Sequence, residues 1–223
     1  VFDSCDKVSE KQHAVNFIIE TIMAAPPGEI TLVAVGPLSN VAMALRLEPL
    51  IAPRLRELIL MGGSMGRGNV TPSAEFNIHA DPEAASIVFA SGANITMIGL
   101  DVTTTVVLDD SRLASLRKIP GRAAAIFGAS MDHYSAACKK YSGECPAMHD
   151  PCCIAYASDP AIMQVQKLAV EIELSGAYTR GRTVVDSVGV TGKKANAFVA
   201  LSVDSARFWD QLEASLRRYG DVR

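Results

Sequence analysis

The chain lacks several features that would assign it to particular classes of protein. Its 223 residues carry a formal net charge of only −3, which is too small to indicate a nucleic-acid or membrane partner. No apolar run reaches the roughly 18 residues of a transmembrane helix. The sequence also contains no internal repeat, linker or low-complexity segment. We therefore expect one globular domain over residues 1–223 that binds neither nucleic acid nor a membrane.

Cysteine usage and the first residues bear on the cellular compartment. The cysteines are Cys5, Cys138, Cys145, Cys152 and Cys153, with no CxxC pair and no metal-finger spacing. An odd number fits reduced thiols in a cytoplasmic protein better than a disulfide framework, and the vicinal pair lies in an apolar stretch typical of a core. The start lacks the basic region and apolar core of a signal peptide. It begins with Val rather than Met, which indicates a processed or partial chain.

Strand patterns alternate with helix patterns along the chain. Short apolar or alternating runs predict strands over 30–35, 58–61, 94–100, 167–174, 182–186 and 196–202. Helical spacing and caps predict helices over 10–24, 39–47, 110–118, 121–140 and 204–217, with others starting near Pro82 and Pro151. The first of these helices is expected to open with a capping box over Ser9–Gln12. This order predicts an α/β fold, a mostly parallel open sheet with helices on both faces.

In such sheets ligands bind at the loops beyond the carboxyl ends of the strands. The loops after Val35, Met61 and Asp101 are therefore expected to share one edge of the sheet. The loop after Met61 is rich in glycine and shows neither helical nor strand periodicity, and loops held by a rigid scaffold often carry binding residues. We expect a binding site at this edge.

The glycine-rich loop delivers Asn69, Glu75 and Asn77 close together. Amides and a carboxylate can accept hydrogen bonds from a polyol, and the amides can also donate. After Pro72 the chain is expected to be extended, so that Glu75 and Asn77 project from the same side. The alternative interpretation, polar residues decorating a surface loop, stays open. A dinucleotide-binding loop fits poorly, because its glycines must open a helix directly and here a long irregular stretch follows them.

A second polar cluster is formed by His149 and Asp150. The imidazole titrates near neutral pH, and the carboxylate is a hard oxygen ligand for a metal ion. Alternatively, Asp150 is only the N-cap of the helix that Pro151 opens, and His149 is a half-buried imidazole with a satisfied hydrogen bond.

Three ordered motifs, VAVGPLSNVAMALRLEP, MGGSMGRGNVTPSAEFNIHADPEAA and MHDPCCIAYASDP, resemble the inosine–uridine-preferring nucleoside hydrolase family. The similarity covers essentially the whole chain. It implies Ca²⁺-dependent hydrolysis of small ribonucleosides to ribose and a free purine or pyrimidine base, in nucleoside salvage. It also implies a cytoplasmic homodimer or homotetramer.

The resemblance assigns the residues of a ribose site. It implies that Asn69, Glu75, Asn77 and the backbone at Met61 hold the sugar.

The resemblance also implies a metal site and a base site. Asp150 would ligate Ca²⁺ together with the main-chain carbonyl of Val35. His149 would lie beside the departing base as a general acid, and Tyr141 is a weaker candidate for a base contact.

The chain departs from the family pattern in one respect. The family's acidic DxDxGxDD-type motif, which supplies most metal carboxylates, is absent; Asp3 and Asp6 lack its context, and Asp109-Asp110 is typical of a helix start. The chain resembles the C-terminal two-thirds of a family member. We therefore expect an N-terminally incomplete domain with exposed apolar sheet edges, weak Ca²⁺ binding and little turnover. The alternative function is a catalytically inactive ribosyl-binding remnant.

Overall fold

The computed structural model describes residues 8–141 and 143–220, so Asp3, Cys5 and Asp6 lie outside the described residues. Its helices are α1 (Ala14–Ala24), α2 (Ser39–Leu47), α3 (Ile51–Arg54), α4 (Phe76–Ala80), α5 (Pro82–Phe89), α6 (Leu100–Thr103), α7 (Asp110–Leu116), α8 (Arg122–Tyr141), α9 (His149–Ser158) and α10 (Ser205–Gly220). Its strands are β1 (Thr31–Ala34), β2 (Glu57–Met61), β3 (Ile95–Ile98), β4 (Met163–Ile172), β5 (Thr183–Asp186) and β6 (Ala197–Val203).

The six strands form one sheet in the order β1-β2-β3-β6-β4-β5. The first four strands in this order pair in parallel, whereas β4 runs antiparallel to both β6 and β5. The predicted α/β fold is confirmed, and the structure adds an antiparallel end to the mostly parallel sheet.

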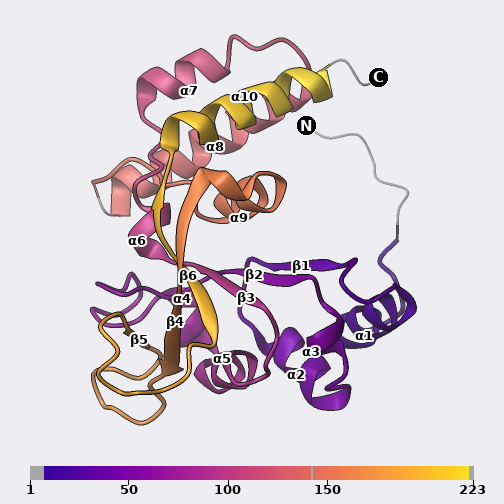
Figure 1. The fold of residues 1–223 in the computed structure, drawn as a ribbon. Coiled ribbons are helices and arrows are strands. Elements are labelled where there is room, and N and C mark those ends of the chain that lie inside the picture. Colours follow the sequence, from indigo (N-terminus) through magenta and orange to yellow (C-terminus); the bar gives the residue numbers. More distant parts are fainter. Residues whose placement is uncertain (1–7, 142, 221–223) are drawn as a thin grey trace.

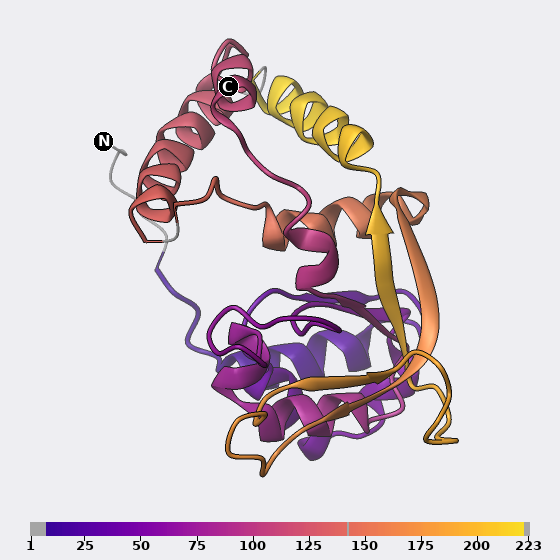
Figure 2. The same ribbon diagram turned by 90° about the vertical axis from the view of Figure 1, so that its left-hand side faces the viewer.

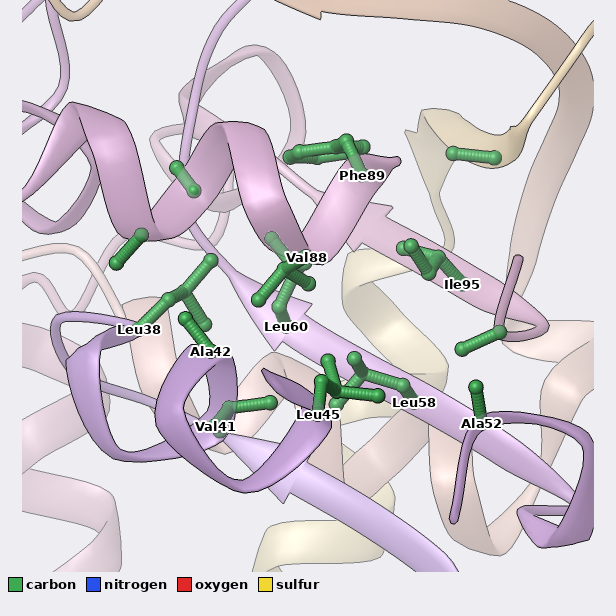
Figure 3. Close-up of a cluster of buried hydrophobic side chains, with 14 of the residues drawn as sticks. Leu38, Val41, Ala42, Leu45, Ala52, Leu58, Leu60, Val88, Phe89 and Ile95 are labelled. Atoms are coloured by element: carbon green, nitrogen blue, oxygen red, sulfur yellow. The ribbon is translucent and has the colours of Figure 1, made fainter. Parts of the chain in front are cut away.

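Helices cover both faces of the sheet because successive residues of a strand point to opposite faces. In β2, Leu58 and Leu60 belong to one hydrophobic cluster, and Ile59 and Met61 belong to the other. The first cluster packs against α1, α2, α3 and α5, and the second packs against α6 to α10 (Figure 1). Figure 3 shows Leu58 and Leu60 among the buried side chains of α2 and α5. The sheet therefore has a core on each face, and its loops remain at the edges.

Local caps explain where two of the helices begin. The Asp81 carboxylate accepts a hydrogen bond from the Ala84 backbone N–H at 3.0 Å, so α5 begins at Pro82 as its acid–proline pair predicts. The predicted capping box over Ser9–Gln12 is wrong, because α1 begins only at Ala14. The imidazole of His13 caps α1 by accepting from Val15 N at 3.2 Å.

Two further predictions concern the core and the sheet edge. Cys152 and Cys153 are fully buried, as expected of core residues, and burial raises the pKa of the Cys152 thiol to about 12. At the other end of the sheet, β1 is the outermost of the described strands, and neighbouring Val35 is 41% exposed. The residues of β1 itself are half-buried, and the expectation of an incomplete sheet stays a prediction. In the described part of the chain, no helix combines the length and apolar character needed to cross a bilayer.

Candidate active site

Glu75 is the most deeply buried carboxylate of the glycine-rich loop, with 2% of its surface exposed. It is the N-cap of α4: its two oxygens accept the backbone N–H groups of Asn77 at 2.8 Å, Ile78 at 3.1 Å and Gly63 at 3.0 Å. Burial raises the pKa of Glu75, whereas the three backbone hydrogen bonds lower it. The nearby charge of Asp150 raises it further, and the net shift is upward. Glu75 thus ties the start of the loop to the helix at its end.

The expected extended stretch after Pro72 is wrong at this point, since Asn77 lies in the first turn of α4 rather than in a strand. Asn77 is 8% exposed and donates from Nδ2 to the Met61 carbonyl at 3.0 Å. Asn69 is exposed, and its Oδ1 accepts from Phe76 N at 2.9 Å. Asn69, Glu75, Asn77 and Met61 therefore form one connected unit, and the surface-decoration alternative does not describe Glu75 and Asn77.

The loops after β2 and β3 meet at the carboxyl edge of the sheet. Asp101, in α6 directly after β3, accepts the backbone N–H of Met65 at 2.7 Å and that of Gly66 at 3.0 Å. These two loops share an edge as predicted from the parallel order of the strands.

His149 is half-buried at the beginning of α9. Its Nδ1 lies 2.7 Å from the hydroxyl oxygen of Thr103, a fully buried residue of α6. Burial lowers the pKa of His149, while the carboxylate of Asp150 acts in the opposite direction. The imidazole is therefore anchored through one ring nitrogen, which leaves the other nitrogen without a hydrogen bond to Thr103.

Asp150 does not cap α9, because the N-cap position is occupied by Met148 and Asp150 lies in the first turn. The capping alternative for Asp150 is thus wrong. Burial raises the pKa of this carboxyl group, and the neighbouring His149 lowers it. The Asp150 carboxylate is therefore not used as the N-cap of α9 and is available to bind a ligand.

Neighbouring cavities connect the residues of the two clusters. Asn69 and His149 line one cavity of about 510 Å³, and His149 and Asp150 line a second of about 340 Å³. Asp150 also lines a third cavity of about 760 Å³, together with Val35. His149 lines the first and second cavities, and Asp150 lines the second and third. Of the predicted sugar residues, Asn69 lines the first cavity, whereas Met61, Glu75 and Asn77 line none of the three.

One predicted site residue lies apart from this region. Tyr141, at the end of α8, is 83% exposed and does not line the cavities that contain His149. Tyr134, two turns earlier in the same helix, lines both of them. Sequence reasoning missed Tyr134 and Thr103, because only the packing of α6, α8 and α9 brings them to His149.

The fit of Ca²⁺ can be judged from the oxygen atoms available. Ca²⁺ takes about 6–8 oxygen ligands. Asp150 offers a carboxylate and Val35 a carbonyl on the same cavity. Among residues 8–141 and 143–220, no three His, Cys, Asp or Glu side chains come together in a way that could hold a metal ion. The described residues therefore supply only part of a calcium site and do not by themselves fit the ion.

An α/β sheet with a glycine-rich loop, an imidazole and a carboxylate near the carboxyl ends of its strands is an arrangement typical of enzymes. The family model described as inosine-uridine preferring nucleoside hydrolase matches residues 2–210. This chain belongs to that family.

Relatives and solved structures agree with this assignment. The putative pyrimidine-specific ribonucleoside hydrolase RihB of Shigella boydii serotype 4 is 44% identical over 98% of this chain and 90% of its own length. RihB of Shigella flexneri serotype 5b is 43% identical over 98% of this chain and 70% of its own length. The purine-preferring ribonucleoside hydrolase from Gardnerella vaginalis superposes with a TM-score of 0.91 at 30% identity, over 99% of this chain and 70% of that one. The plant nucleoside hydrolase PpNRh1 superposes with a TM-score of 0.90 at 29% identity, over 96% of this chain and 69% of that one.

Proposed function

We propose that this protein hydrolyses the N-glycosidic bond of ribonucleosides, releasing ribose and a free base. The observation that carries the proposal is that Asn69 and His149, from distant parts of the sequence, line the same cavity. One is a hydroxyl-binding amide beside the Glu75–Asn77 unit, and the other is a titratable imidazole. Family membership supports the same reaction.

The sugar side would orient the ribose and favour its charged transition state. Cleavage of the bond builds positive charge on the ribosyl ring, and negative charge from fixed carboxylates stabilises it. Asp150 lines the cavity adjoining that of Asn69, and its charge acts on Glu75. In this proposal Asn69, Asn77 and the Met61 backbone position the sugar. The carboxylates provide the negative charge that stabilises the positively charged ribosyl ring.

The base side would assist departure of the base, on which negative charge develops. His149 lines the cavity with its ring held by Thr103, so its other nitrogen is the one that can face the leaving base. General acid catalysis of this kind is worth about 10²–10⁴-fold. His149 is therefore the proposed general acid.

The family resemblance implies a Ca²⁺ ion, which would supply Lewis-acid chemistry if further oxygen ligands complete its site. In this proposal Asp150 and the Val35 carbonyl are its ligands from the described residues. A cytoplasmic location, a role in nucleoside salvage and a homodimeric or homotetrameric state also remain predictions. The higher identity to pyrimidine-specific relatives favours uridine over inosine as the first substrate to test.

The test is release of free ribose from uridine and inosine during long incubations at high protein concentration. We expect a low rate, which His149→Gln lowers at least about 100-fold. His133→Gln, an exposed histidine of α8, is the matched control and should leave the rate unchanged. Binding of nucleoside without any ribose release would instead support the inactive ribosyl-binding alternative.

Calorimetric titration with Ca²⁺ tests the metal prediction in the same preparation. Two oxygen ligands of the 6–8 that the ion takes predict weak binding and little stimulation of ribose release. Tight binding accompanied by rapid turnover would contradict this prediction.

A further inference from the structure

The short segment Gly63–Gly66 begins the glycine-rich loop, and other segments hold its backbone at every residue. Gly63 donates its N–H to Glu75 and accepts from Leu100 N at 2.9 Å. The N–H groups of Met65 and Gly66 both go to Asp101. The remaining residue, Ser64, is held from a part of the chain that sequence analysis did not connect with the site.

That part is the start of β5. The hydroxyl of Thr183 accepts the Ser64 N–H at 2.8 Å and donates to the Ser64 carbonyl at 2.6 Å, so one side-chain oxygen satisfies both backbone groups. Thr183 is 2% exposed. Its neighbour Arg182 donates from Nη2 to the Met65 carbonyl at 3.1 Å. The contact is buried, and it uses the hydrogen-bonding capacity of the hydroxyl as both donor and acceptor.

The geometry leaves little room for the loop to shift against β5. Gly63 has φ +77°, and a Cβ built on it would lie 2.6 Å from the Thr183 methyl carbon and 3.0 Å from its hydroxyl oxygen. Thr183 pairs with Ile172 in the antiparallel end of the sheet, where β4 also pairs with β6 (Figure 2). The loop thus rests on a strand that is itself fixed in the sheet.

We propose that Thr183 is a positioning residue of the ribosyl site, and that the β4–β5 pair is part of the active-site scaffold. The hydroxyl fixes Ser64, and through Gly63 and Glu75 it sets the position of Asn77 and the Met61 carbonyl. This inference rests on the proposed function, because a ribosyl group is what the positioned loop binds.

The experiment compares Thr183→Val, which removes both hydrogen bonds at similar volume, with Thr183→Ser, which retains the hydroxyl. Thr191→Val is the matched control, because it removes an exposed threonine hydroxyl bond to Asp186 outside the loop. Amide hydrogen exchange over residues 62–68 and calorimetric binding of uridine are measured on the full chain.

Thr183→Val should lower the exchange protection of the loop about ten-fold and raise the Kd for uridine about ten-fold, which lies within the range expected when two hydrogen bonds of typical net strength are lost. Thr183→Ser should restore both values, and Thr191→Val should change neither. Equal effects of the Val and Ser variants, or unchanged protection in Thr183→Val, would overturn the proposal. A wild-type chain that binds no nucleoside, combined with lost protection in Thr183→Val, would overturn the proposed function while leaving the loop anchor in place.

Discussion

The sugar side and the base side of the cavity are built in different ways. On the sugar side, residues 61–81, backbone N–H groups are fixed by buried side chains such as Glu75 and Thr183. On the proposed base side, α8 and residues 143–149 line the cavity. Residues 146–148 are joined to residues 106–108 by one bridge, with backbone hydrogen bonds of 2.9 Å from Leu108 N to the Pro146 carbonyl and from Met148 N to the Val106 carbonyl. A ribose is the same in every nucleoside, whereas the base varies. In the proposed site, the fixed backbone of the loop would therefore face the constant ribose, and residues of α8 would face the variable base.

Substitution of Glu75 is expected to have the largest effect on the sugar side of the cavity. In Glu75→Gln, an amide NH₂ replaces one of the two acceptor oxygens. Because Gly63 and Ile78 donate to one oxygen and Asn77 to the other, either the first two N–H groups or that of Asn77 lose their partner. One or two such losses cost about 2–5 kcal/mol. We expect that decrease in the free energy of unfolding, measured by urea denaturation, together with loss of uridine binding. Glu20→Gln, on the exposed face of α1, is the control; similar stability of both variants would mean that Glu75 is not a structural carboxylate.

Substitution of Gly63 by alanine, compared with the same substitution of Gly28, separates the cost of backbone strain from the cost of overpacking against β5. Gly63 and Gly28 have nearly the same positive φ, +77° and +78°, but only Gly63 faces neighbouring atoms. Gly28→Ala should cost the strain alone, about 1–2 kcal/mol. Gly63→Ala should cost about 2–4 kcal/mol, because overpacking against Thr183 is added. Urea denaturation measures the decrease in the free energy of unfolding for both variants. Equal decreases would show that the loop can shift away from Thr183 at little cost.

The smallest expected effect concerns the base side. Tyr134 lines the cavities with His149, whereas Tyr141 is exposed. We expect Tyr134→Ala to change the ratio of uridine to inosine affinity about ten-fold, because one side of a pocket for the base is removed. Tyr141→Ala should change the ratio less than about two-fold. Calorimetry with both nucleosides measures the ratio, and a larger effect of Tyr141 would support the assignment taken from family resemblance.

Much of the fold follows from local patterns. The apolar run before Val35 and the acid–proline pair at Asp81 predict β1 and the start of α5, because burial and capping act over a few residues. The family resemblance also assigns His149 and Asp150 to the site, and this assignment stays a prediction. The N-cap role of Glu75 was not predictable in this way. One of its hydrogen-bond donors, Gly63, lies 12 residues earlier in the chain and contacts Glu75 only in the folded loop.

Residues that act through tertiary contacts carried no sequence signal. Thr103 is the first of three consecutive threonines and Thr183 is a single threonine, and no spacing connects them with His149 or Ser64. Their roles arise from the crossing of elements that are distant in sequence. The parts of a site that touch a ligand are thus easier to predict than the parts that hold them.

The contact between Ser64 and Thr183 also has a consequence for the order of folding. It spans 119 residues, so closing it carries a loop entropy that local contacts do not. During synthesis, the first β–α units can pack as they emerge, but the backbone N–H and carbonyl of Ser64 lack their Thr183 partner until β5 has been made. Long-range pairings of this kind slow folding. The ribose loop should therefore be among the last segments to order in a newly made chain, so that a binding-competent site marks a protein whose sheet is already assembled.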